Sequence, residues 1–269
     1  MSQKNLFVSN LGWQHSDFNK IIKLIKKNNI TGIDIAPIQL NNRWNNIEKK
    51  LQKFQKKIKY LNLKVNALQG IFYKTDFNLF QSDKLQKKKI SRHMKKILKI
   101  SRMFDCKKII IGSSYFRKVN NVSEEKADLI FINFFKNFKP LLKKKKIYLC
   151  FETIPKNYGE NYLYDIKKLI YLIKKIKSPW CKVNFDSSLF HFRKFDKNIF
   201  LKNKKYIKNI QISEKNFNYL IKPSKSNMYF SKLINNDKKN KDISLEIIAK
   251  TTNLRKISLS LNNFRKIFN

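Results

Sequence analysis

Residues 146–152 read KIYLCFE, a short run of apolar and aromatic residues that predicts a buried strand and ends in one carboxylate, Glu152. The same pattern returns twice. CKVNFD at 181–186 ends in Asp186, and DISLE at 242–246 ends in Glu246. The chain has only 18 acidic residues among 269, so carboxylates placed at strand ends are unexpected for solvated surface charge.

A fourth run of this kind, KNIQIS at 208–213, contains Gln211 and is followed by Glu214. Glu152, Asp186, Gln211 and Glu246 are 34, 25 and 35 residues apart in turn, about one strand–helix unit each. In a parallel barrel the carboxyl ends of all strands meet on one face, so these groups are expected to converge. Converging carboxylates that are distant in sequence indicate a divalent metal site.

Strand and helix signals alternate along the whole chain. The sequence predicts eight short apolar strands, typical of strands buried on both faces: Asn5–Ser9, Gly32–Ala36, Lys64–Leu68, Lys108–Gly112, Ile147–Glu152, Lys182–Asp186, Ile207–Ser213 and Ile243–Glu246. Eight strands with intervening helices in 269 residues predict a single (β/α)8 TIM barrel domain spanning residues 1–269.

Amphipathic helices are expected between the strands. The apolar stripes that predict them lie at 18–25, 47–61, 90–98, 130–141, 163–173 and 254–268. The last helix, Leu254–Phe268, should pack outside the barrel. The segment from Lys215 to Asp242 is rich in Asn and Lys, and it predicts at most a short helix around Asn227–Ile234.

The net charge of +42 would ordinarily indicate nucleic acid or an anionic surface. However, 53 of the 60 basic residues are Lys and only 7 are Arg, which favours base bias of the genome over recognition by Arg forks. The lysines are also spread over nearly every helix and loop. We therefore expect no specific nucleic-acid partner.

Three cysteines, Cys106, Cys150 and Cys181, form no CxxC motif, so neither a disulfide framework nor a zinc knuckle is expected. The N-terminus lacks an apolar stretch of signal-peptide length, and no run approaches 18 apolar residues. A soluble cytoplasmic protein without a membrane partner is the expectation. Neither GxGxxG nor GxxxxGK[ST] is present, so no nucleotide cofactor is expected.

Six motifs along the chain carry a resemblance. They are GIDIAPIQ (32–39), IIIGSSYFRK (109–118), CFETIPKNYGENYL (150–163), VNFDSSLF (183–190), IQISEKNF (210–217) and ISLEI (243–247). Their order and spacing resemble the xylose-isomerase-like TIM barrels, most closely the sugar phosphate isomerases/epimerases. The resemblance covers nearly the whole chain, although no single motif is diagnostic.

The resemblance implies a divalent metal held by four residues at the ends of strands five to eight: Glu152, Asp186, Gln211 and Glu246. It also implies that Glu152 and Glu246 act as acid and base on opposite faces of a sugar. Gln211 departs from the family pattern, which has histidine there; its amide oxygen is a neutral, weaker donor, and the set favours Mn²⁺ or Mg²⁺ over Zn²⁺. Leu189 stands where some relatives have another histidine.

Further residues are candidates for substrate binding: His15, Arg117, Lys156, Tyr158, His191 and Glu214. Each also has a structural alternative, as a loop residue or, for Glu214, as a partner of Gln211. Arg117, with Lys118, could contact a phosphate or carboxylate because arginine presents a bidentate fork. Asp34 could be functional or structural, and His93, on a helix, is expected to be structural.

The leading hypothesis is a metal-dependent isomerase or epimerase that moves a proton of a small sugar, or sugar phosphate, through an enediolate. A non-catalytic barrel that binds a sugar or a partner is the alternative, given Gln211 and Leu189. An apurinic-site endonuclease is less favoured, since the resemblance implies a histidine-rich multi-metal site and the chain has 3 histidines. The oligomeric state stays open, with a homodimer as one option.

Overall fold

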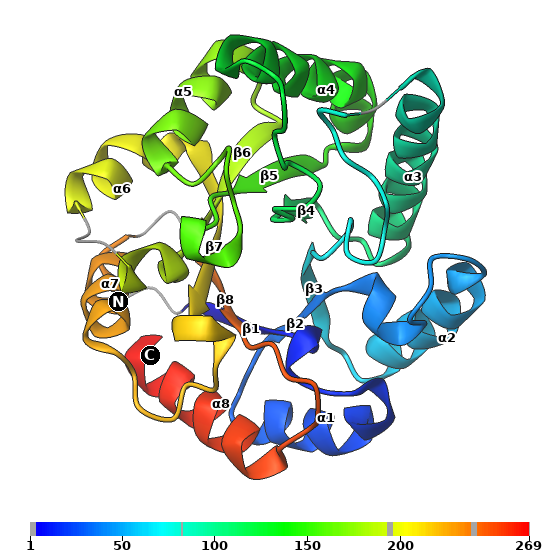
Figure 1. Cartoon of the computed structure of the whole chain (residues 1–269). Coiled ribbons are helices and arrows are strands. Elements are labelled where there is room, and N and C mark those ends of the chain that lie inside the picture. Colours follow the sequence, from blue (N-terminus) through cyan, green and yellow to red (C-terminus); the bar gives the residue numbers. More distant parts are fainter. Residues whose placement is uncertain (1–3, 82, 193–195, 238–240, 269) are drawn as a thin grey trace.

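The computed structural model describes residues 4–81, 83–192, 196–237 and 241–268. Its eight strands are all parallel and close into a barrel in chain order, from β1 to β8 (Figure 1). The strands are β1 (Asn5–Ser9), β2 (Gly32–Ile35), β3 (Lys64–Leu68), β4 (Lys108–Ile111), β5 (Tyr148–Glu152), β6 (Cys181–Asp186), β7 (Ile207–Ser213) and β8 (Asp242–Glu246). The predicted fold class is confirmed.

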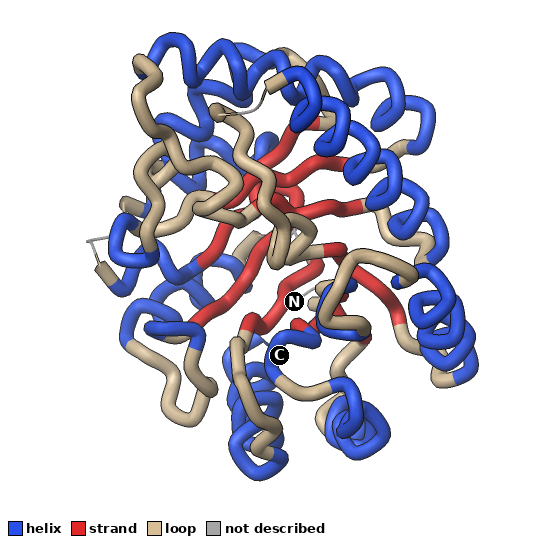
Figure 2. The backbone as a smooth tube through the Cα atoms, turned by 45° about the vertical axis from the view of Figure 1, so that its right-hand side comes forward, coloured by secondary structure: helices blue, strands red, loops and turns tan. Residues whose placement is uncertain are grey.

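Helices surround the strands on the outside (Figure 2). They are α1 (Phe18–Lys27), α2 (Ile47–Tyr60), α3 (Lys84–Met103), α4 (Glu124–Lys145), α5 (Ile166–Ile176), α6 (Lys197–Asn203), α7 (Lys225–Asn235) and α8 (Leu254–Phe268). Short 3₁₀ helices lie in the connections: η1 (Asn10–Gly12), η2 (His15–Asp17), η3 (Pro37–Leu40), η4 (Lys156–Tyr158), η5 (Ser187–His191), η6 (Lys204–Tyr206) and η7 (Lys215–Phe217).

The strands follow from the sequence because nearly every strand residue is buried, either inside the barrel or beneath the helices. One close approach requires a glycine. A Cβ on Gly32 would lie 1.9 Å from the carbonyl oxygen of Lys64 on the neighbouring strand. Only a bare backbone permits this contact between β2 and β3.

The final helix, α8, packs outside the barrel beside α1 and α7, as predicted. Its buried side chains Ile257, Leu261, Phe264 and Phe268 repeat at helical spacing and join the main hydrophobic core. No helix within the described ranges combines the length and apolar character needed to cross a bilayer.

Two helices differ from expectation. The apolar pattern does not predict α6, because this helix has 7 residues and only Phe200 is buried, which is too short for a recognisable stripe. Helix α7 extends over 11 residues rather than the short segment expected, since Ser224 caps its N-terminus by accepting a hydrogen bond from the Asn227 backbone.

Candidate metal centre and its cavity

The barrel brings three carboxylates from different strands to one place. Glu152 ends β5, Asp186 ends β6 and Glu246 ends β8, and one oxygen of each lies within 4.8 Å of the other two. All three side chains are buried. Closed parallel pairing from β5 to β8 produces this cluster, because it places all these strand ends on one rim.

Burial and mutual repulsion disfavour the charged forms of these acids. Burial, followed by the charge of Asp186, raises the pKa of Glu152 to about 8. Burial also raises the pKa of Asp186, and it raises that of Glu246 well above its usual range, with the charges of Glu152 and Asp186 adding to the effect. The cluster therefore favours either bound protons or a cation.

Asp186 is fixed more firmly than the two glutamates. Its Oδ1 accepts a hydrogen bond from the Ser188 backbone at 2.5 Å, and its Oδ2 accepts one from the Ser213 hydroxyl at 2.9 Å. These bonds hold the carboxylate at the start of η5. Asp186 is fully buried, whereas Glu152 and Glu246 also line the adjacent cavity.

Gln211, on β7, is fully buried beside the carboxylates and is bonded on both sides of its amide. Its oxygen accepts a hydrogen bond from the amide nitrogen of Asn184, which also donates to Glu152 at 3.0 Å. Its nitrogen donates to the amide oxygen of Gln69 at 2.7 Å. One lone pair of the Gln211 oxygen remains for a further partner.

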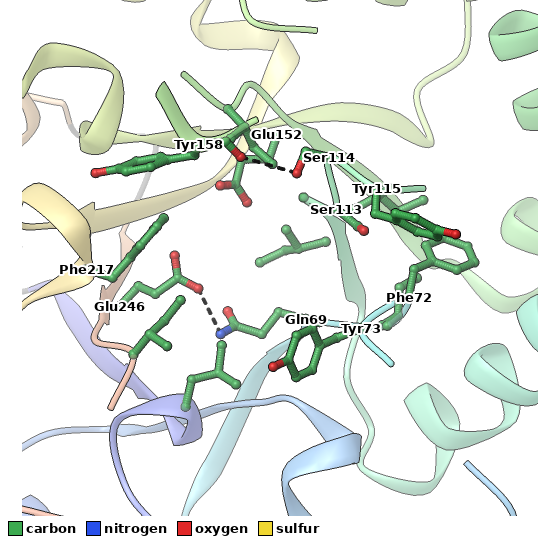
Figure 3. A pocket seen from close by; sticks show the side chains of 18 of the residues that line it. Gln69, Phe72, Tyr73, Ser113, Ser114, Tyr115, Glu152, Tyr158, Phe217 and Glu246 are labelled. Atoms are coloured by element: carbon green, nitrogen blue, oxygen red, sulfur yellow. Dashed lines mark hydrogen bonds between the residues drawn. The ribbon is translucent and has the colours of Figure 1, made fainter. Parts of the chain in front are cut away.

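A cavity of about 650 Å³ opens over the two glutamates. Its walls come from the loops at the carboxyl ends of the strands, and several of its side chains are aromatic (Figure 3). Tyr73 and Tyr115 lie on one side of the opening, and Tyr158 and Phe217 on the other. A cavity with aromatic walls and a few convergent polar groups is typical of a small-molecule site.

Arg117 is not in the cavity, although its place after a strand predicts an anion contact. Its side chain is 0% exposed and forms an ion pair with Glu160 at 2.6 Å. It also donates to the backbone oxygens of Ile111 at 3.0 Å and Glu152 at 2.8 Å. The guanidinium therefore contacts the backbone behind the candidate site, and both of its terminal nitrogens are already bonded within the protein.

Among the other candidate substrate residues, the structure brings only Tyr158 to the cavity. Its hydroxyl accepts a hydrogen bond from the Asn216 backbone at 2.8 Å, and this bond links two loops of the rim. Lys156 is exposed and extends over the ring of Tyr164 at 4.1 Å. His15 is exposed and packs against Phe18 and Phe54, away from the site.

His191 and Glu214 lie behind the site rather than in the cavity wall. His191 hydrogen-bonds the backbone oxygen of Ser213 at 2.7 Å, and its charge would lower the pKa of neighbouring Asp186. Glu214 accepts hydrogen bonds from the Ser224 backbone at 2.8 Å and from the Asn227 amide at 2.9 Å. Glu214 thus fixes the start of α7.

The structure also shows which groups surround His93 and Asp34. His93 bonds the backbone oxygen of Ile71 at 2.6 Å and packs against Trp44, so its predicted structural role is confirmed. Asp34 is fully buried inside the barrel, where it accepts a hydrogen bond from the Asn66 amide at 2.7 Å.

Sequence reasoning did not single out two residues of the site, Gln69 and Asn184, and it did not predict the contact of Gly112 with Glu152. Gln69 donates to Glu246 at 3.1 Å (Figure 3), and a Cβ on Gly112 would lie 2.5 Å from Oε2 of Glu152. Gln69 directly follows β3, as the carboxylates end their strands, so the same position rule could have identified it.

The sequence profile of a family described as xylose isomerase-like TIM barrel matches residues 22–225, which is most of the chain. The chain therefore belongs to the xylose isomerase-like TIM barrel family.

Three solved structures share this fold at low sequence identity. D-Psicose 3-epimerase from Clostridium cellulolyticum H10 has a TM-score of 0.78 and 11% identity over 98% of this chain and 99% of that one. The 3-keto-D-glucoside 4-epimerase from E. coli has a TM-score of 0.77 and 10% identity over 98% and 99% of the two chains. A family 2 AP endonuclease from Brucella melitensis has a TM-score of 0.76 and 13% identity over 97% and 98%. No curated protein sequence matches this chain.

Proposed function

We propose that this protein is a divalent-metal-dependent isomerase or epimerase of a small sugar or sugar phosphate. The observation that carries the proposal is the cluster of Glu152, Asp186 and Glu246, whose oxygens lie within 4.8 Å of one another beside a cavity of about 650 Å³. The epimerases among the similar structures support the reaction class.

The donor set fits a hard divalent cation. Three buried carboxylates repel one another, and oxygen ligands are those that Mg²⁺ and Mn²⁺ prefer. Gln211 can add its amide oxygen through the lone pair that Asn184 does not use. Such a cation, when bound, would stabilise negative charge on the oxygens of a hydroxy-carbonyl substrate.

Glu152 and Glu246 would move the proton. Both line the cavity, so both can reach a bound substrate, and they come from strands β5 and β8. One glutamate takes a proton from the carbon next to the carbonyl, which gives an enediolate. The other glutamate returns a proton, to the opposite face in epimerisation.

The cavity walls suit a sugar. Ser113 and Ser114 offer hydroxyls, while Tyr73 and Tyr115 offer aromatic faces for the apolar side of a ring. A phosphate group, if the substrate carries one, would meet Lys74 or Lys250, the lysines that line the opening. The Arg117 fork cannot bind phosphate while it holds Glu160.

Hydrogen exchange in D₂O tests the proposal across many sugars at once. Each member of a panel of aldoses, ketoses and their phosphates is incubated with Mn²⁺-loaded protein, and deuterium at the carbon next to the carbonyl is followed by NMR. At least one sugar should exchange and give an epimer or isomer. Glu152→Gln and Glu246→Gln should each abolish exchange, whereas Glu125→Gln, on the exposed start of α4, should not.

Two other outcomes are informative. Saturable sugar binding without exchange at any carbon would contradict the enzyme and favour the non-catalytic barrel. Cleavage of DNA at abasic sites would favour the endonuclease instead. Only carboxylates form a candidate metal cluster in the described residues, and none of the three histidines belongs to it. We therefore expect no such cleavage.

A further inference from the structure

The two glutamates of the candidate site are joined by a continuous line of amide hydrogen bonds. Gln69 donates to Glu246 at 3.1 Å, and its oxygen accepts from Gln211 at 2.7 Å. The oxygen of Gln211 accepts from Asn184, whose nitrogen also donates to Glu152 at 3.0 Å. In order, the line runs from Glu246 on β8 to Gln69, the residue after β3. It continues to Gln211 on β7 and Asn184 on β6, and it ends at Glu152 on β5.

The direction of every bond in this line is fixed by its ends. The Gln69 and Asn184 amides present nitrogen to Glu246 and Glu152, and the contacted carboxyl oxygens accept, with any bound proton on the other oxygen. The oxygen of Gln69 then faces Gln211, which must donate with its nitrogen and accept with its oxygen. All three amides satisfy these requirements at once, and therefore no amide can flip without breaking two contacts.

Burial makes the line hard to replace. Gln69 is 3% exposed, and Asn184 and Gln211 are 0% exposed, so water cannot readily take over a lost contact. The Gln69 nitrogen is held from a second side by the Ser9 hydroxyl at 2.5 Å, which fixes the amide to the end of β1. A side chain anchored in this way can transmit its position to Glu246.

We infer that Gln69 is the positioning residue of this site, which holds Glu246 directly and Glu152 through Gln211 and Asn184, and so sets the spacing of the two glutamates. The inference rests on the proposed function for what the glutamates do. Neutral amides can bridge two carboxylates without supplying charge, so the need for a cation remains. Gln211 then serves chiefly as the link between Gln69 and Asn184.

The test is Mn²⁺ binding, measured by calorimetry and by the EPR spectrum of the bound ion. Gln69→Met keeps the shape but removes the three hydrogen bonds of the Gln69 amide, to Glu246, to Ser9 and from Gln211, and it should weaken Mn²⁺ binding about tenfold, or about 1.4 kcal/mol. The zero-field splitting of bound Mn²⁺ should change as Glu246 loses its position. The matched control is Gln39→Met, which alters another cavity-lining glutamine that bonds the Trp13 backbone, and it should bind Mn²⁺ within about twofold of wild type.

Ser9→Ala offers a milder variant should Gln69→Met fold poorly. It frees one side of the Gln69 amide and should weaken Mn²⁺ binding about threefold, as the loss of one net hydrogen bond implies. The inference is overturned if both variants bind Mn²⁺ like wild type with an unchanged spectrum, even if their thermal stability falls. If wild type itself binds no Mn²⁺, the proposed function and the inference both fail, whereas Mn²⁺ binding by wild type and both variants alike overturns the inference alone.

Discussion

Gly112 lies against the carboxylate of Glu152, so closely that a Cβ on Gly112 would be 2.5 Å from Oε2. The backbone conformation of Gly112 is open to other residues, since its φ is not in the left-handed region. The space beside Gly112 is therefore filled by the end of the Glu152 side chain, and a larger residue here would have to move that carboxylate.

Gly112→Ala should displace the Glu152 carboxylate and weaken Mn²⁺ binding by about tenfold. Overpacking should also cost about 1–3 kcal/mol of unfolding free energy. Calorimetric titration and urea unfolding measure the two effects. Gly159→Ala is the control, because Gly159 has a φ of +82° and no neighbour within 4 Å of its Cβ position, so it should lose stability without losing Mn²⁺ affinity.

Arg117→Met should destabilise the fold severely, by about 3–5 kcal/mol, because it leaves Glu160 as an unpaired buried charge. Urea unfolding of this variant is compared with that of Arg92→Met, an exposed position on α3 that should change stability little. Equal stability of the two variants would show that the buried ion pair does not hold the loop after β5.

The stability of the metal-free protein should fall as pH rises from about 5 to about 8. Burial raises the pKa of Glu152 to about 8 from an ordinary value of 4.5. The resulting contribution to stability is complete below about 4.5, and it is lost as pH passes through 8. Thermal melting with a chelator should show this loss, and Glu152→Gln should reduce the slope.

Mn²⁺ affinity should follow the opposite course over the same pH range. Binding displaces protons from the carboxylate cluster, so affinity rises by about tenfold per pH unit for each proton displaced and levels off once the three carboxyl groups are ionised. Titrations at several pH values between 6.5 and 9 measure this slope. An affinity independent of pH would contradict the protonation of the cluster.

Gln211→His should shift metal preference toward Zn²⁺, because imidazole nitrogen suits zinc better than an amide oxygen does. The ratio of Zn²⁺ to Mn²⁺ affinity, measured by competition, should rise at least about tenfold. An unchanged ratio would mean that the side chain at position 211 does not bind the ion. Gln211 would then act only as the hydrogen-bonded link between Gln69 and Asn184.

The barrel could be predicted because each strand has a local signature. Runs such as KIYLCFE are short, apolar and spaced at one strand–helix unit, and parallel closure then follows from their number. The convergence of Glu152, Asp186 and Glu246 needs only the additional rule that carboxyl ends share a rim. Helix α6 was missed because its 7 residues bury one side chain.

The partners of individual side chains could not be predicted in this way. Arg117 follows a strand, as an anion-binding residue would, but its partner Glu160 lies 43 residues further along the chain. Gln69 gains its role from contacts to residues 142 and 177 positions away. Such pairings depend on the closed barrel, and no local pattern encodes them.

Titration of Mn²⁺ into the metal-free wild-type protein tests the metal centre most directly. We expect one ion per chain and, at a hundredfold excess over the dissociation constant, about 2.7 kcal/mol of added stability. Asp186→Asn, which changes a buried oxygen ligand without altering the cavity wall, should remove most of this binding. Absence of saturable Mn²⁺ or Mg²⁺ binding in the wild type, or equal binding by Asp186→Asn, would contradict the metal centre.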